Sequence, residues 1–183
     1  MATRIQMALM MAVFCLQLTS GVSASAEEGM HHPPAPATNA DFERLKSLAG
    51  AWEGTVTHLG GEAEPASINF AVTAGGSALV ETEFPGTEHE MVTVFYMQGD
   101  QLALTHYCML GNQPTMAAQP DNDPDTLSFD FTGGTNIETG NEFHMRKLEY
   151  TFIDPDHITA TWTSYVQGEP SACAVIDLKR KTE

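Results

Sequence analysis

The chain has 183 residues, with 24 Asp and Glu against 8 Lys and Arg, so its formal net charge at pH 7 is −16. Between Lys46 and Arg146 there are fourteen Asp and Glu residues and no Lys or Arg. Phosphate-rich partners need basic side chains to neutralise them, so this balance argues against nucleic acid and anionic lipid surfaces as partners. A well-solvated acidic exterior is the expected reason for the excess charge, and a role in attracting cations is the alternative.

The first 26 residues have the pattern of a secretory signal peptide. Arg4 gives a positive start, residues 7–18 are mostly apolar, and residues 24–26 (Ala-Ser-Ala) form a small-x-small cleavage signal. The apolar run is too short for a membrane span, and no second run of membrane length follows it. We therefore expect an exported protein, periplasmic or secreted, without a membrane span.

Residues 27–40, EEGMHHPPAPATNA, are rich in Pro, Ala and Glu and are expected to form a flexible leader. The remaining residues, 41–183, have a length that suits one domain with a single core. Near the boundary, Thr38 or Asn39 can cap a short helix that ends at Gly50. Its apolar face consists of Phe42, Leu45 and Leu48. A helix this short is not stable alone, so we expect that face to dock across one end of the domain.

After Gly50 the chain becomes a series of short segments rich in Val, Phe, Thr and Tyr, and no long segment has helical period. The ten predicted strands cover residues 51–58, 66–74, 78–84, 90–98, 101–108, 114–119, 126–132, 142–153, 157–166 and 172–180. Turn sequences such as Gly75-Gly76 separate them. Ten sequential strands with short links predict an all-β, up-and-down antiparallel sheet that closes into a barrel, because closure removes exposed edges.

Alternation along each strand predicts which side chains point into the barrel. The facing of residues 78–84 and 142–153 is less clear than that of the other strands. Glu81 and Glu83 alternate with Val80 and Phe84, which favours the outer face for both carboxylates. A ten-stranded barrel encloses more volume than a smaller one, and an internal cavity is compatible with this fold.

The segment LTHYCMLGNQPTM, residues 104–116, brings a histidine, a tyrosine and a cysteine together. Leu104 and His106 share one face of the strand, whereas Tyr107 has the other, so we predict His106 inside and Tyr107 outside. Asn112 then lies on a loop at the barrel mouth. His106 can be a satisfied polar residue, an anchor for a ligand, or a metal or haem ligand, and the sequence leaves these open.

A helix followed by Gly50-Ala51-Trp52 at the start of the first strand, with a basic residue closing the last strand, resembles the lipocalin and fatty-acid-binding superfamily. In that superfamily the tryptophan packs at the closed end of the barrel, and a late Arg or Lys lies over its ring. The resemblance implies a cation–π contact between Trp52 and Arg180, with Lys179 as the other option.

The wider pattern FERLKSLAGAWEG, followed by GGSALVETEFPGTEHEMVTVFYMQGDQLALTHYC and GNQP, resembles a bacterial exported lipocalin-like family of unassigned function. This resemblance covers most of residues 42–180. It implies the calycin-type barrel and does not imply a reaction.

A ten-stranded haem-binding member of the same superfamily, nitrobindin, also begins with a G-x-W-x-G strand, which residues 50–54 (Gly-Ala-Trp-Glu-Gly) match. The further glycines and the Tyr-Pro that extend the nitrobindin motif are missing after Gly54. Haem therefore stays an open option, and no other cofactor is expected.

The leading functional hypothesis is a binding protein whose cavity holds a small, mostly apolar ligand, with the imidazoles of His58 and His106 as polar anchors. The proposed lining is Trp52, His58, Phe70, Met91, Phe95, His106, Asn112, Phe129 and Trp162. A filled barrel whose outer face binds another protein is a further possibility, and the oligomeric state is not predicted.

An enzyme is the alternative hypothesis. His106 and a carboxylate at the barrel mouth, Glu90, could act together as acid and base. No G-x-S-x-G, H-E-x-x-H, phosphate-loop or dinucleotide motif supports a particular reaction.

The histidines and cysteines do not have metal-ligand spacing. The histidines after the leader are scattered over different strands and loops, so no metal site is expected. Cys108 and Cys173 are the only cysteines outside the signal peptide. In an oxidising compartment they could form a disulfide or stay as two free thiols, and the sequence leaves both open.

Overall fold

The computed structural model describes residues 35–120 and 123–182. The predicted signal peptide and residues 27–34 of the predicted leader lie outside the described residues. The described chain forms α1 (Ala40–Lys46) and then β1 (Gly50–His58), β2 (Ala63–Thr73), β3 (Ala78–Glu83), β4 (Met91–Gln98), β5 (Gln101–Tyr107), β6 (Gln113–Gln119), β7 (Thr126–Thr135), β8 (His144–Asp154), β9 (His157–Val166) and β10 (Glu169–Arg180).

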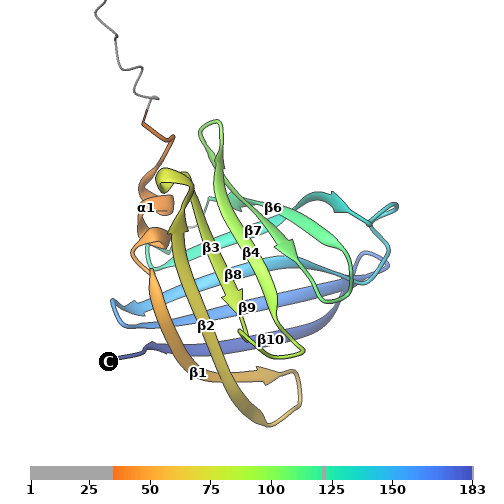
Figure 1. The fold of residues 1–183 in the computed structure, drawn as a ribbon. Helices are drawn as coiled ribbons and strands as arrows, with labels where there is room; N and C mark the ends of the chain where they lie inside the picture. The colour runs from red at the N-terminus through yellow and green to blue at the C-terminus, as the bar shows by residue number, and fades with distance from the viewer. Residues whose placement is uncertain (1–34, 121–122, 183) are drawn as a thin grey trace, which may run out of the picture. The chain divides into compact units, whose positions relative to one another are not determined.

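The strands form one closed antiparallel barrel (Figure 1). Each strand pairs with the next in sequence, and β10 pairs with β1 to close the sheet. The predicted all-β, ten-stranded barrel is therefore confirmed, and the predicted strand ends differ from the observed ones by no more than three residues. At the closing pair, a Cβ on Gly54 would collide with the backbone carbonyl of Asp177, so this position requires glycine.

Helix α1 docks on one end of the barrel through its apolar face. Asn39 caps the helix, because its side-chain oxygen accepts a 2.8 Å hydrogen bond from the backbone N–H of Phe42. Phe42, Leu45 and Leu48 are all buried in the main core. The helix thus closes the end of the barrel where β1 begins, as its apolar spacing predicts.

Trp52 and Arg180 make the contact that the superfamily resemblance implies. The guanidinium carbon of Arg180 lies 4.4 Å from the centroid of the Trp52 ring. The same guanidinium donates 3.0 Å hydrogen bonds to the carbonyls of Ala49 and Ser47, just after α1. The indole Nε1–H of Trp52 donates to the carbonyl of Leu48 at 2.7 Å. These contacts tie the end of the helix to both β1 and β10.

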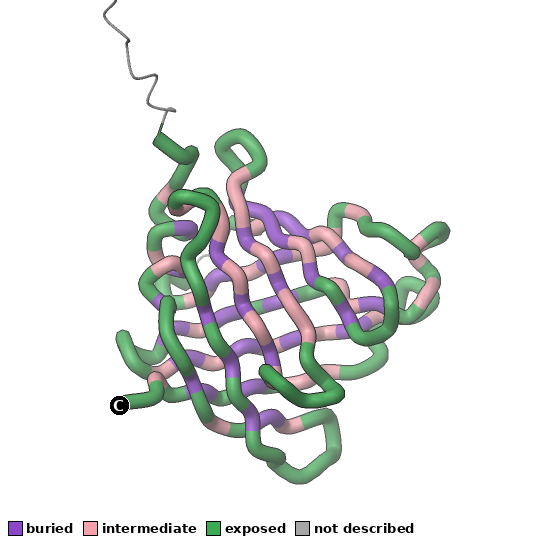
Figure 2. Tube along the Cα trace, viewed as in Figure 1, coloured by how far each residue is buried: buried purple, intermediate pink, exposed green. Residues whose placement is uncertain are grey.

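Aromatic rings fill the half of the barrel next to α1. The ring centroids of Trp52 and Phe70 lie 6.4 Å apart, and those of Phe95 and Phe129 lie 5.7 Å apart. Tyr150 joins the two pairs, at 6.5 Å from Phe70 and 6.2 Å from Phe95. Figure 2 shows buried positions alternating with more exposed ones along the strands. This half of the barrel is a packed core.

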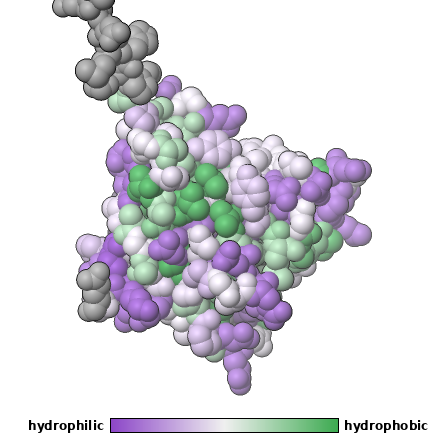
Figure 3. All heavy atoms as spheres, in the orientation of Figure 1, coloured by the Kyte–Doolittle hydropathy of each residue, from purple (hydrophilic) through white to green (hydrophobic). Residues whose placement is uncertain are grey.

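The outer face of the barrel mixes polar and apolar side chains, as the space-filling view shows (Figure 3). Within the described part of the chain, no helix is both long and apolar enough to span a membrane.

Candidate functional site

A cavity of about 260 Å³ lies at the end of the barrel away from α1, and we call it the mouth pocket. It is lined by His58, Met91, Cys108, Met109, Leu110, Phe143, Met145, Trp162, Ser164, Ala172, Cys173 and Ala174. Its volume is slightly below the usual range of small-molecule sites. Met109 and Phe143 are 57% and 40% exposed, so apolar side chains reach solvent at its rim.

The loops around the mouth pocket are held together by hydrogen bonds. The backbone N–H of Cys108 donates to the carbonyl of Asn112, and the N–H of Gly111 donates back to the carbonyl of Cys108. Gly111 has a φ of 82°, a left-handed conformation that favours glycine. The side-chain amide of Asn112 donates to the carbonyl of Phe143 at 2.9 Å, which joins the β5–β6 and β7–β8 connections.

Behind this pocket, Glu81 and Glu83 point into the barrel, so the prediction that they lie outside is wrong. The two side chains are 0% and 1% exposed. Glu81 has Thr93 as its Cα partner across β3 and β4, and Glu83 has Met91. Directly opposite residues share a face of the sheet, and both partners face inward. Alternation divides the side chains of a strand between its two faces. In β3 the more apolar face, which includes Val80, is the outer one.

A row of hydrogen-bonding side chains crosses the barrel interior at Glu81. Thr93 is the Cα partner of both Glu81 and His106, so the three lie side by side on β3, β4 and β5. The hydroxyl of Thr93 lies 2.9 Å from Nδ1 of His106. From the far wall, the hydroxyl of Tyr150 donates a 2.8 Å hydrogen bond to Oε1 of Glu81. The imidazole of His106 packs on Trp162, with the centroids 4.6 Å apart.

Burial favours the uncharged form of each ionisable group in this row. Burial raises the pKa of Glu81 well above its usual value, and the neighbouring charge of Glu83 raises it further. Burial raises the pKa of Glu83 to about 7 and lowers the pKa of His106 to about 4. Near neutral pH, His106 is therefore uncharged and Glu83 is close to its midpoint, and burial favours the protonated form of Glu81.

Four buried polar atoms in this region have no hydrogen-bond partner among the described residues. They are Oε2 of Glu81, Oε1 of Glu83, Nε2 of His106 and Nε1 of Trp162. A buried donor or acceptor without a partner costs about 1–3 kcal/mol, so such atoms are rare in folded proteins. We call Glu81, Glu83, Thr93, His106, Tyr150 and Trp162 the interior polar cluster. Its unpaired atoms distinguish it from an ordinary structural network.

Glu83 lies directly behind the wall of the mouth pocket. Its Cα partner Met91 lines the pocket. The indole Nε1–H of Trp162 is near enough to lower the pKa of Glu83, although the two do not reach hydrogen-bond geometry. The pKa of the Cys108 thiol is raised by burial and also by the charge of Glu83. The charge of Glu83 therefore acts on a group that lines the pocket.

The proposed ligand-lining residues fall into three groups. His58, Met91 and Trp162 line the mouth pocket. Asn112 and His106 lie beside it, the first tying loops together and the second packed behind Trp162. Those in the packed core, which do not line the mouth pocket, are Trp52, Phe70, Phe95 and Phe129.

The acid–base pair of the enzyme hypothesis is not brought together. Glu90 is exposed in the β3–β4 connection, where its carboxylate accepts a 2.6 Å hydrogen bond from the backbone N–H of Gly86. His106 is buried on β5 with Thr93 as its partner. Glu81, which the sequence pattern assigns to the outside, occupies the position beside Thr93 and His106.

Cys108 and Cys173 are free thiols that line the same cavity. Within residues 35–120 and 123–182, no group of three or more His, Cys, Asp or Glu side chains is arranged to hold a metal ion. The lining also includes three methionines, whose flexible thioethers adapt to irregular apolar shapes.

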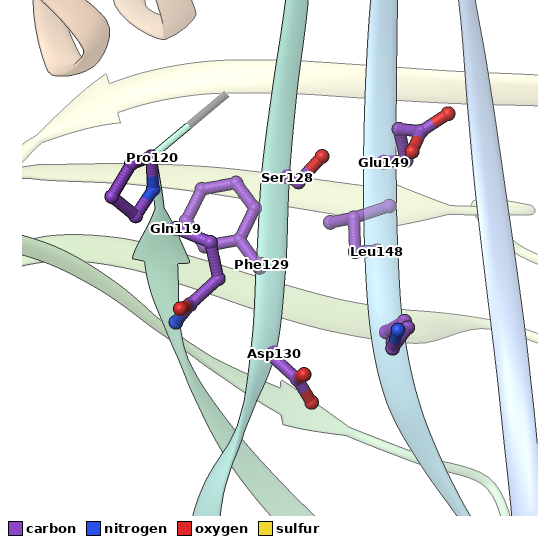
Figure 4. Close-up of a pocket in the computed structure, with 8 residues that line it drawn as sticks. Gln119, Pro120, Ser128, Phe129, Asp130, Leu148 and Glu149 are labelled. Carbon is purple, nitrogen blue, oxygen red and sulfur yellow. The ribbon is translucent and has the colours of Figure 1, made fainter. Parts of the chain in front are cut away.

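A second hollow, of about 230 Å³, lies between Gln119 and the β7–β8 pair (Figure 4). In the close-up the side chains of Ser128, Asp130 and Glu149 are spread along two strands and do not point to one centre. Lys147 also lines this hollow. This second hollow lacks the apolar rim and the unpaired buried atoms that distinguish the mouth pocket.

Among solved structures, the chain is similar to Rv2717c from M. tuberculosis, with a TM-score of 0.52 and 12% sequence identity. That match covers 80% of this chain and 100% of the other. A protein of unknown function from the DUF3598 family of Nostoc punctiforme PCC 73102 has a TM-score of 0.43 and 13% identity, covering 83% of this chain and 53% of the other. At 12% identity the likeness to Rv2717c shows the fold alone. No protein-family model and no curated protein matches the chain.

Proposed function

We propose that this chain is an exported, lipocalin-like barrel protein that binds a small, mostly apolar ligand in the mouth pocket. The observation that carries the proposal is a cavity with apolar walls and an exposed apolar rim, backed by buried polar atoms without partners. Apolar walls with a few convergent polar groups are typical of small-molecule sites. The signal-peptide pattern supports export, and the Trp52–Arg180 contact supports the lipocalin-like assignment.

The walls of the pocket indicate how such a ligand would lie. Met145 and Phe143 offer apolar surface near the rim, and Met91 continues it inward. The deeper wall is formed by Trp162 and Cys108, behind which the interior polar cluster lies. We infer that the apolar body of the ligand contacts the methionines and Phe143, and that its polar end lies against Trp162.

Filling the cavity is the direct test of this proposal. Ala174 lines the pocket, and its Cα faces that of Trp162 across β9 and β10. Ala174→Leu should therefore occupy ligand space with little change to the core. Ala71 is exposed on β2, so Ala71→Leu is the matched control.

The measurement is native mass spectrometry of the mature protein, purified without detergent and then mixed with octan-1-ol. We expect the parent and Ala71→Leu to hold a small molecule, either co-purified or the added alcohol, and Ala174→Leu to lose it. Equal retention by Ala174→Leu, or no bound molecule in the parent under either condition, would remove the proposal.

A further inference from the structure

We propose that the mouth pocket selects ligands whose polar end is positively charged, namely primary amines on an apolar body, and discriminates against carboxylates. This inference rests on the proposed function, because it names the class of ligand that the same pocket takes. It is carried by the charges behind the pocket wall and by the aromatic surface inside it.

Two acidic groups, Glu81 and Glu83, lie behind the pocket wall. Glu83 and Glu81 lie on the inner face of β3 with unpaired carboxyl oxygens. No Lys or Arg lines the pocket, and His106, the basic group in the interior polar cluster, is held uncharged by burial. A carboxylate ligand would therefore meet like charge in a low-dielectric region and find no cation to pair with.

Two basic residues lie beside the lining residues Phe143 and Met145 in sequence. The ring of the buried His144 packs on Phe131, 4.6 Å between centroids, and its Nδ1 lies 2.6 Å from the carbonyl oxygen of Glu142. Arg146 follows Met145, but its guanidinium lies over the ring of Tyr165, 5.2 Å from the centroid. It also pairs with Asp130 at 3.9 Å. His58 is an exposed imidazole that lines the pocket, with Ala174 between it and Trp162 across β1, β10 and β9.

The pocket also offers aromatic surface to a cation. Trp162 and Phe143 both line it, and ammonium groups are attracted to the faces of such rings. His106 covers one side of the Trp162 ring, with 4.6 Å between the ring centroids. The rest of the ring is the part that lines the cavity. The same ring faces repel carboxylates, because their π-electrons are negative.

Cys108 shows the penalty that an anion meets in this cavity. It lines the pocket, and the pKa of its thiol is raised because burial and the charge of Glu83 both disfavour the thiolate. A carboxylate placed there would face the same two costs. An ammonium group would instead be attracted by the negative form of Glu83 across the pocket wall.

Three ligands of equal chain length test the inference: octylamine, octan-1-ol and octanoate. Their affinities are measured at pH 7 by isothermal titration calorimetry, below the concentrations at which they aggregate. We expect octylamine to bind about tenfold more tightly than octan-1-ol, and octanoate to bind most weakly. Glu83→Gln should bring the affinity for the amine close to that for the alcohol. Glu149→Gln, which removes an exposed charge on β8, should leave the order unchanged.

The outcomes separate the two proposals. If octanoate binds as tightly as octylamine, the charge selectivity is wrong and the proposed function stands. If Glu83→Gln keeps the full preference for the amine, Glu83 is not its source and the inference fails. If none of the three ligands binds, the proposed function fails and this inference fails with it. The comparison among ligands uses the parent protein alone, so it does not depend on the folding of a variant.

Discussion

The hydroxyl of Tyr150 donates a 2.8 Å hydrogen bond to Oε1 of Glu81, which joins β8 to β3 across the inside of the barrel. The ring of Tyr150 packs against Phe70 and Phe95 of the aromatic core. Its hydroxyl reaches the interior polar cluster. Tyr150 therefore marks the boundary between the half of the barrel that is packed and the half that holds the mouth pocket.

Tyr150→Phe should destabilise the protein by about 1–3 kcal/mol, because it leaves Oε1 of Glu81 buried without a donor. The ring contacts with the core are kept, so the loss reports the hydrogen bond. The free energy of unfolding is measured with urea at pH 7. Tyr107→Phe is the control, since Tyr107 is 51% exposed and the change should be small. Equal effects of the two substitutions would mean that the Glu81–Tyr150 bond contributes nothing.

Trp52→Ala should reduce the free energy of unfolding by roughly 3–5 kcal/mol, as for other large buried aromatic side chains. Trp52 is 1% exposed, packs on Phe70, and holds the Arg180 guanidinium over its ring. Arg180→Ala should cost less, because the indole would keep its core contacts. Urea unfolding of both variants makes the comparison. If Trp52→Ala is as stable as the parent, the Trp52–Arg180 contact does not hold the α1 end of the barrel closed.

Glu83→Gln should become more stable relative to the parent as the pH rises from about 4.5 to about 7. The pKa of Glu83 is about 7 in the folded chain against an ordinary value of 4.5. Between these values the folded chain holds a proton that the unfolded chain has released. Stability from this carboxyl is therefore present below pH 4.5 and is lost as the pH rises, by about 3 kcal/mol in all.

His106 has the opposite effect, so the measurement must compare variants at each pH. Its pKa is about 4 in the folded chain against 6.5, and its stability contribution is lost as the pH falls through that window. The other titratable groups facing Glu83 are Glu81, Cys108 and Tyr150. Urea unfolding of the parent, Glu83→Gln and the control Glu149→Gln between pH 4 and pH 8 isolates the Glu83 contribution. A difference between Glu83→Gln and the parent that does not change with pH would contradict the assignment.

Haemin should give no histidine-dependent Soret band with the mature protein. His58 is the histidine that lines the mouth pocket, and His106 has its Nδ1 bonded to Thr93 and its ring against Trp162. Absorption spectra are recorded for the parent, His58→Ala and His106→Ala. A sharp band in the parent that disappears in one variant would make the barrel a haem protein and would displace the proposed function.

The strands could be predicted from the sequence because period-two alternation and turn residues are local signals. The facing of β3 could not, since Val80 is more apolar than Glu81 and hydrophobicity alone assigns the carboxylates to the outside. The register settles it, by placing Glu81 opposite Thr93. The predicted inward position of His106 is confirmed, because Leu104 shares its face and both are buried.

The position of the cavity cannot be predicted from the sequence, for a different reason. Inward-facing residues can be recognised, but whether they fill the space depends on how rings from distant strands meet. Phe95 on β4 and Phe129 on β7 meet and fill the α1 half of the barrel. Met91, on the same face of β4 as Phe95, lines the mouth pocket.

Tryptophan indole resonances give the most direct test of the mouth pocket as the ligand site. The chain has 2 tryptophans, of which Trp162 lines the pocket and Trp52 lies in the core beside α1. ¹H–¹⁵N spectra are recorded during titration with octylamine and, separately, with octan-1-ol, and the two indole peaks are assigned with Trp162→Phe. We predict saturable movement of the Trp162 peak, with the Trp52 peak unmoved and with no response in Ala174→Leu. Movement of the Trp52 peak alone, or the same Trp162 response in Ala174→Leu, would contradict a ligand site in this pocket.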